Sequence, residues 1–255
     1  MSKLPESHRF VDLSDYGRPL ARVIAAQLKE SKFTPIHVTW GFLLSGLIAV
    51  FCILNEFYIF ASFFLLLKSV LDAADGELAR VSNTPSYVGR YFDSIADIIL
   101  NFLILIAVYT ISKSSLFSAF AAFIGIQLQG TLYNYYYVIL RNKLDGDTTS
   151  RIFEHKEPRA FEGEQQKNVK ILFHIYKALY SGFDKLIFKL DRNATTGAAF
   201  PNWFMTLIST MGLGFQLLLI SVFLVLGFKE FIIPLFIVYT TLIFVFVGIR
   251  KVLLP

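Results

Sequence analysis

The sequence is poor in charge, since only 17% of its 255 residues are Asp, Glu, Lys or Arg. Soluble domains carry about 25% of such residues. Cysteine occurs once, as Cys52, so no disulfide can form within the chain. The first 37 residues contain no apolar run of the kind found in a signal peptide, and we expect no cleavable one. The shortage of charge therefore argues against a soluble domain.

Apolar residues are abundant, with 55% of the chain hydrophobic, 27 Phe and a mean hydropathy of +0.57. They gather in blocks long enough to cross about 30 Å of hydrocarbon as helices. The six blocks cover residues 38–55, 57–80, 87–111, 116–140, 203–227 and 230–250. We therefore predict an all-α integral membrane protein with six transmembrane helices. They form a membrane domain, residues 38–255, that follows an N-terminal arm of residues 1–37.

Two other stretches combine apolar and basic residues at helical spacing. The first covers residues 12–32, and the second covers residues 169–190 within a polar segment, 141–202. The second stretch holds four lysines and an aspartate, too many charges for a seventh crossing. Both patterns are typical of amphipathic helices that lie on a membrane surface, with basic side chains towards the head groups.

Lys and Arg are distributed unevenly between the two ends of the predicted spans. Six lie in the N-terminal arm and eleven in the segment 141–202, whereas Lys113 and Lys229 stand near the opposite helix ends. The positive-inside rule places both termini, the turn 81–86 and the segment 141–202 in the cytoplasm. In a bacterium this would be the inner membrane. The net charge of +5 fits basic loops that face anionic lipid better than it fits nucleic-acid binding.

Four aspartates interrupt the apolar sequence on either side of the turn 81–86: Asp72, Asp75, Asp93 and Asp97. A carboxylate at the centre of a bilayer costs about 2.5–3.5 kcal/mol, so four of them indicate a function. Their spacings of three and four residues put each pair on one helix face, and a hairpin can turn both faces into one cleft. Because the predicted spans end there, we expect this cleft near the cytoplasmic side.

Four carboxylates in one cleft repel one another, and bound cations relieve that repulsion most simply. Only oxygen ligands are offered, which favours Mg²⁺, Mn²⁺ or Ca²⁺ over zinc. Two such ions would suit phosphoryl chemistry. Gly76, Ala79 and Gly89 would leave room for a ligand, and Arg80 and Arg90 could meet phosphate oxygens. Taken singly, each aspartate could instead belong to an ion-pair network or a proton relay, and a cation transporter remains the non-enzyme alternative.

The full spacing is Asp72-x2-Asp75-Gly76-x2-Ala79-Arg80-x8-Gly89-x3-Asp93-x3-Asp97. It resembles the signature of the CDP-alcohol phosphotransferases, also called CDP-alcohol phosphatidyltransferases, which are integral-membrane enzymes of phospholipid synthesis. Eight fixed positions would match by chance on the order of 10⁻¹⁰ of the time. The six-span layout extends the resemblance over most of the chain.

The resemblance implies that a CDP-alcohol transfers its substituted phosphate group to an acceptor hydroxyl and releases CMP. The four aspartates would bind two divalent cations, and Asp97 would also act as general base. Asp72, Gly76, Ala79, Arg80 and Gly89 would line the CDP site. The family likeness further implies a homodimer surrounded by membrane lipids.

The resemblance leaves the substrates open. Either CDP-diacylglycerol, which we favour, reacts with a small polar alcohol, or a CDP-choline- or CDP-ethanolamine-type donor reacts with a lipid alcohol. A phosphorylated acceptor would need cations beyond the metals, for which Arg90, Arg141 and Arg151 are candidates, although a solvated cytoplasmic loop explains Arg141 and Arg151 as well. The aromatic run 133–137 could cage a choline-like cation or form an interfacial aromatic belt. Many members carry Asn where this chain has Ile36, and His37 could replace that contact or be a neutral interfacial side chain.

Overall fold

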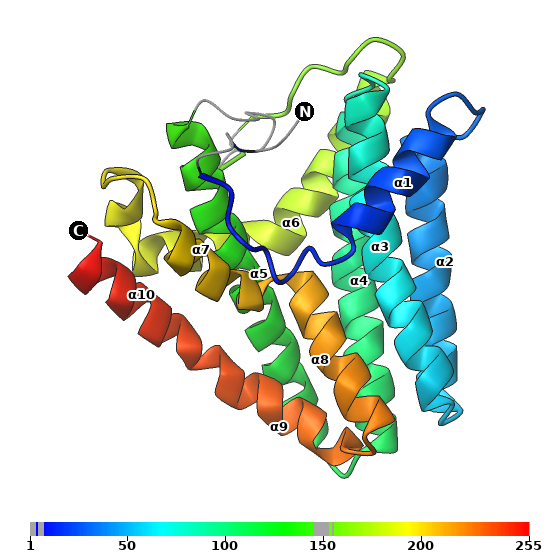
Figure 1. Ribbon diagram of the computed structural model, residues 1–255, viewed down its shortest axis with the longest axis vertical. Helices are drawn as coiled ribbons and strands as arrows, with labels where there is room; N and C mark the ends of the chain where they lie inside the picture. Colours follow the sequence, from blue (N-terminus) through cyan, green and yellow to red (C-terminus); the bar gives the residue numbers. More distant parts are fainter. Residues whose placement is uncertain (1–3, 5–7, 145–152, 155, 255) are drawn as a thin grey trace.

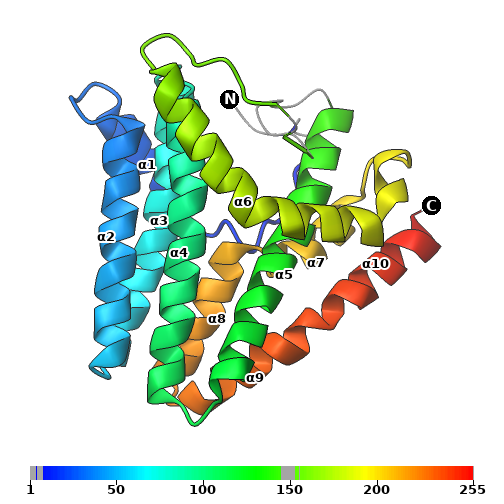
Figure 2. The ribbon, with the colours of Figure 1, turned by 180° about the vertical axis from the view of Figure 1, so that it is seen from behind.

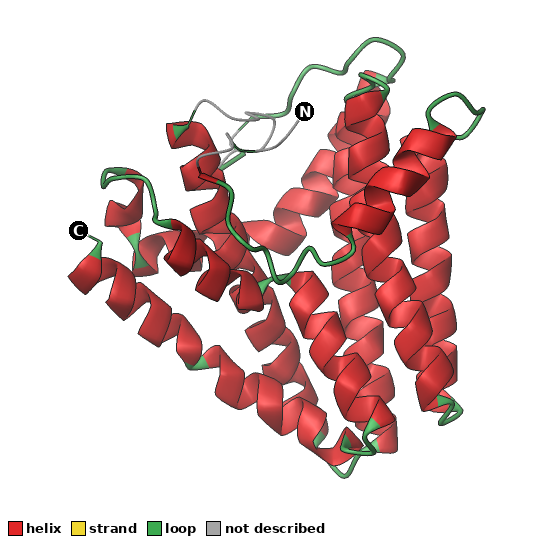
Figure 3. Ribbon diagram, viewed as in Figure 1, coloured by secondary structure: helices red, strands yellow, loops and turns green. Residues whose placement is uncertain are grey.

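The structure is a computed structural model that describes Leu4 and residues 8–144, 153–154 and 156–254. Within these residues the regular structure is helical throughout, with no strand (Figure 3). The helices are α1 (Arg18–Leu28), α2 (Pro35–Leu54), α3 (Tyr58–Val81), α4 (Tyr87–Ile111), α5 (Leu116–Lys143), α6 (Gln166–Leu190), α7 (Asn202–Ile208), α8 (Leu213–Val225), α9 (Lys229–Thr240) and α10 (Leu242–Leu253). Two 3₁₀ turns, η2 (Arg192–Thr195) and η3 (Ser209–Met211), complete the described secondary structure.

Four helical stretches are long and apolar enough to cross a membrane: α2, α4, α5, and α9 with α10 taken together. A fifth is counted if α7 and η3 form one span with α8, from which they are bent by 55°. α3 is 24 residues long, but Lys68, Asp72 and Asp75 lie within its apolar part. The part of the chain that the structure describes is therefore all-helical, with four or five apolar span candidates, and the six predicted spans are not confirmed.

The helices form a bundle that is tight at one end and splayed at the other (Figure 1). The short connections 55–57, 112–115 and 226–228 lie at the tight end, where α2, α3, α4, α5, α8 and α9 meet. Towards the other end α5 leans away from α4, and α6 crosses the space between them and contacts both (Figure 2). The largest group of buried apolar side chains fills the tight half, and it includes Phe42, Leu65, Leu100 and Phe236.

The two predicted amphipathic stretches are helical, with changed bounds. α6 begins three residues before the expected start, whereas α1 begins at Arg18 and not at Asp12. Pro19 explains the late start of α1, because proline fits only the first turn of a helix. The location of both helices on a membrane surface stays a prediction.

The predicted span 203–227 is not one straight helix. The chain leaves the 3₁₀ turn η3 at Gly212, whose backbone is extended, and starts again as α8. Residues 12–17 of the arm run beside this break, where the Leu13 amide donates to the Ser209 hydroxyl at 2.9 Å. The Tyr133 hydroxyl on α5 donates to the Asp12 carboxylate. The arm is thus held by elements that follow it by more than a hundred residues.

We expect Gly214→Ala to displace the arm from the start of α8. A Cβ at Gly214 would lie 1.9 Å from the carbonyl oxygen of Ser14, and a backbone atom cannot swing away as a side chain can. Overpacking of this kind typically costs about 1–3 kcal/mol. Thermal unfolding in detergent and limited proteolysis of the arm should show lower stability and faster cleavage. The matched control is Gly248→Ala on α10, where a Cβ meets no atom within 4 Å; equal behaviour of the two variants would contradict this packing.

Candidate active site

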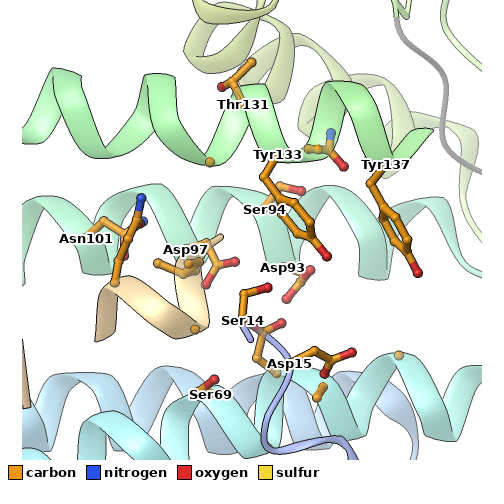
Figure 4. A pocket seen from close by; sticks show the side chains of 18 of the residues that line it. Ser14, Asp15, Ser69, Asp93, Ser94, Asp97, Asn101, Thr131, Tyr133 and Tyr137 are labelled. Carbon is orange, nitrogen blue, oxygen red and sulfur yellow. The ribbon is translucent and has the colours of Figure 1, made fainter. Parts of the chain in front are cut away.

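A cavity of about 430 Å³ opens in the splayed half of the bundle. Its walls come from the arm and α1, from α3, α4 and α5, and from α6 and α8. In Figure 4, Asp97 and Asn101 lie towards one side of the pocket, and Tyr133 and Tyr137 lie towards the other. All four predicted aspartates line this cavity, together with Asp12, Asp15 and Asp184.

Three of the four aspartates are grouped as metal ligands would be. Asp72, Asp75 and Asp93 each offer a carboxylate oxygen, and these atoms lie within 4.8 Å of one another. The hydroxyl of Thr39 on α2 donates to Oδ2 of Asp75 at 2.7 Å, and this hydrogen bond orients the carboxylate. One oxygen of Asp93 is buried and has no hydrogen-bond partner among the described residues. An unsatisfied buried carboxylate oxygen is costly, so this donor set fits a divalent cation.

The fourth aspartate is held differently, by a buried lysine. The Lys68 ammonium forms an ion pair with Asp97 and lies 3.7 Å from a carboxylate oxygen of Asp72. It also lies 5.1 Å from the centre of the Phe42 ring, and Lys68 has no exposed surface. A buried charge persists only when it is paired, so this lysine offsets part of the negative charge of the four aspartates.

The residues expected at the CDP site separate into two groups. Asp72, Gly76 and Arg80 line the cavity, and Arg80 pairs with Glu77 at 3.1 Å. Ala79 and Gly89 are not among the lining residues, and the Gly89 amide instead donates to the Ser86 hydroxyl that caps α4. The expectation that these two positions contact CDP stays a prediction.

Two of the three candidate acceptor arginines, Arg90 and Arg141, are described by the structure, and both are engaged with other side chains. Arg90 forms an ion pair with Glu154, and Arg141 is buried with its guanidinium 5.1 Å from the Tyr137 ring. Neither is among the residues that line the cavity, and Arg151 lies outside the described residues. Their proposed contact with an acceptor phosphate is not tested by this arrangement.

The aromatic run 133–137 divides between two environments. Tyr133, Asn134 and Tyr137 line the cavity, whereas the hydroxyls of Tyr135 and Tyr136 donate to Asp191 at 2.8 and 2.7 Å.

His37, which could have replaced the missing Asn, is not among the lining residues. Its ring nitrogen instead accepts from the Thr34 amide at 3.1 Å in the cap of α2.

Sequence reasoning missed several residues of the site. Lys68 stands in an apolar run, and the argument that singled out the aspartates applies equally to a lysine there. No motif marks the other missed groups. They come from the arm (Asp12, Ser14, Asp15 and Arg18), from α5 (Gln127 and Thr131) and from α6 (Tyr176, Tyr180 and Asp184).

Asp184 predicts a measurable pH dependence of stability. Burial, aided by the charge of Glu154, raises the pKa of its carboxyl to about 7. The folded protein then binds a proton that the unfolded chain releases between about pH 4 and pH 7, so the free energy of unfolding falls as the pH rises through that window. We expect Asp184→Asn to remove this fall, worth about 1–3 kcal/mol after allowance for its partial exposure.

The measurement is thermal unfolding in detergent, without divalent cations, between pH 4 and pH 8. The Tm of the wild type should fall relative to that of Asp184→Asn up to about pH 7 and run parallel above it. Parallel curves throughout would show that Asp184 is ionised at an ordinary pKa.

Comparison with known proteins relates part of the chain to a family. A family model described as CDP-alcohol phosphatidyltransferase matches residues 33–151. These residues include all of the predicted signature and helices α2 to α5. No similar curated protein and no similar solved structure was found. Residues 33–151 therefore form a CDP-alcohol phosphatidyltransferase domain, and this family consists of transferases for substituted phosphate groups.

Proposed function

We propose that this protein transfers a substituted phosphate group from a CDP-alcohol to an acceptor hydroxyl in the synthesis of a phospholipid. The observation that carries the proposal is the meeting of Asp72, Asp75, Asp93 and Asp97 in one cavity, within the region that matches the family. Our preferred donor is CDP-diacylglycerol. A CDP-choline- or CDP-ethanolamine-type donor with a lipid alcohol as acceptor is the alternative.

Asp72, Asp75 and Asp93 would hold the first of two divalent cations, either Mg²⁺ or Mn²⁺, and the same oxygens would accept Ca²⁺. Such cations would neutralise phosphate charge and stabilise the departing CMP. Asp97 would contribute to the second cation. It has two carboxylate oxygens, so the ion pair with Lys68 can occupy one of them and leave the other available.

In the reaction, Asp97 would take the proton of the acceptor hydroxyl as that oxygen bonds to the phosphorus that carries the alcohol. The bond between this phosphorus and the oxygen of CMP breaks, and CMP leaves. Arg80 would face the diphosphate, since it lines the cavity beside Gly76 at the end of α3. Lys68 would keep the Asp97 carboxylate in place.

The proposal includes the membrane arrangement expected from the sequence. α3 would be a span in spite of its charges, because it packs against α2, α1 and α8 and turns Asp72, Asp75 and Arg80 towards the cavity. With α2, α4, α5, the bent pair α7–α8 and α9–α10, this gives six spans. The site would face the cytoplasm, α1 and α6 would lie at the membrane surface, and two copies would form a dimer.

The test is CMP release by the purified full-length protein with Mg²⁺ or Mn²⁺. CDP-diacylglycerol or CDP-choline would be supplied with varied acceptors, and Asp97→Asn would be run beside the wild type. Metal-dependent CMP release that disappears in the variant would support the proposal. No release with any pair would overturn it, and so would release that Asp97→Asn leaves unchanged.

A cation transporter is the competing function, and the break at Gly212 is the observation that favours it. Broken helices near the membrane centre are typical of transporters, and α8 beside this break lines the cavity. The signature and the family match weigh more, because they specify a transfer reaction. Metal-dependent ion flux into liposomes, without CMP release, would establish transport instead.

A further inference from the structure

The side chain of Gln127 has no role in the reaction described so far. Gln127 on α5 lines the cavity and is 6% exposed, and its amide nitrogen has no hydrogen-bond partner among the described residues. The nearby buried glutamines differ from it. Gln216 donates to the side chain of Gln129 at 3.0 Å, and Gln129 donates to the Thr240 hydroxyl at 2.9 Å. A buried amide donor without a partner is costly, so Gln127 is the one of these three that needs a ligand.

Gln127 belongs to a polar, uncharged part of the wall. Gln127, Gly130, Thr131 and Asn134 recur at spacings of three and four residues and line the cavity from α5. From α4, the cavity is lined by Asn101, which lies one helical turn beyond Asp97 (Figure 4). The acceptor hydroxyl must meet Asp97, so this amide-lined region is where the rest of the acceptor would lie.

The cations of the cavity wall are at its other end. Only two of the described lining residues are basic, Arg18 and Arg80, and both pair with Glu77. Arg80 lies in the last turn of α3, beside the turn at which α4 begins. Asn101 lies fourteen residues further along α4, about 21 Å at 1.5 Å per residue. A phosphate bound beside Asn101 and Gln127 would therefore meet no basic lining residue, and the nearby Lys68 ammonium is already paired with Asp97.

A cationic acceptor is also poorly matched to this region. The carboxylate nearest to it in the chain, Asp97, is already paired with Lys68. An ammonium group placed there would face the donor end of the Gln127 amide, which has no hydrogen-bond partner among the described residues. Amide donors suit instead the oxygen of a hydroxyl or an ester carbonyl.

We propose that Asn101, Gln127 and Thr131 form the acceptor subsite, and that it takes an uncharged alcohol. Gln127 donates to an oxygen of that alcohol while its reacting hydroxyl faces Asp97. This chemistry has two sources, a small polyol or a lipid alcohol such as diacylglycerol. The inference rests on the proposed transfer reaction and adds the class of its acceptor.

The experiment measures CMP release by the full-length protein in lipid nanodiscs with Mg²⁺, for each donor with a panel of acceptors. Inositol and glycerol represent small polyols and diacylglycerol represents lipid alcohols. Serine carries an ammonium group, and glycerol 3-phosphate and inositol phosphate carry a phosphate. We expect the highest kcat/KM with an uncharged alcohol. The acceptor that gives it shows whether that alcohol is a small polyol or a lipid alcohol.

The variant Gln127→Met keeps the length of the side chain and removes the amide. We expect it to raise the KM for the acceptor about three- to tenfold, as loss of one neutral hydrogen bond does. The KM for the CDP-alcohol should stay within about twofold. Gln27→Met on the exposed face of α1 is the matched control and should change neither constant.

Two results would overturn the inference while leaving the transfer reaction intact. One is preferred use of a phosphorylated or ammonium-bearing acceptor, and the other is an unchanged acceptor KM in Gln127→Met. If no pair of substrates releases CMP, the proposed function itself fails and the subsite fails with it.

Discussion

Asp97→Asn should lower kcat by about 10²–10⁴, the usual contribution of a general base. The amide keeps the size of the side chain but cannot take the proton of the acceptor hydroxyl. The KM for the CDP-alcohol should change little, because Asp72, Gly76 and Arg80 on α3 are untouched. The measurement is steady-state CMP release at saturating acceptor, with Mg²⁺ in excess.

Metal binding separates loss of the base from loss of the metal site. The three grouped carboxylates belong to Asp72, Asp75 and Asp93, so Asp97→Asn should still bind one Mn²⁺, detectable by electron paramagnetic resonance. Asp93→Asn should lose both that ion and activity. If Asp97→Asn retains more than a tenth of the wild-type kcat, the proton is taken by another group.

Lys68→Met should destabilise the metal-free protein by about 3–5 kcal/mol. This is the usual cost of removing one partner of a buried ion pair, because the carboxylates of Asp97 and Asp72 then lack the ammonium that offsets them. Methionine fills nearly the same volume beside Phe42, so a loss of packing should add little. Thermal unfolding in detergent with a chelator gives the difference in stability.

A double variant distinguishes charge from packing. Lys68→Met/Asp97→Asn removes both members of the pair, so its loss of stability should be smaller than that of Lys68→Met alone. Added Mg²⁺ should raise the Tm of Lys68→Met more than that of the wild type, since a cation can take the place of the ammonium. Additive losses and equal responses to Mg²⁺ would show that the ion pair contributes nothing to stability.

The sequence was a good guide wherever one physical requirement dominates. The length needed to cross hydrocarbon predicted residues 87–111 as a helix, and α4 has these bounds. The hairpin argument predicted that the faces of Asp72 and Asp93 would meet, and they do. Both results depend on local periodicity and a short turn, which a single sequence displays directly.

Other features depend on contacts between distant parts of the chain, which periodicity does not report. α6 contributes to the cavity wall because it crosses α4 and α5 and contacts both. One of these contacts, the hydrogen bond from the Tyr180 hydroxyl to the Ser94 carbonyl, joins residues 86 positions apart. The late start of α1 was predictable in principle, because Pro19 limits where that helix begins. The role proposed for Gln127 was not predictable, because the sequence does not distinguish it from Gln129 on the same helix. Gln129 donates a hydrogen bond to Thr240 within the bundle.

The path of residues 12–17 has a consequence for the order of folding. Asp12 and Ser14 line the cavity, yet Asp12 accepts from Tyr133 on α5, and Leu13 between them donates to Ser209 beside the break between α7 and α8. Residues 12–17 leave the ribosome well before these partners, since Tyr133 follows Asp12 by 121 residues and Ser209 follows Leu13 by 196. Contacts so distant in sequence form late, so the cavity should close only after the bundle has assembled.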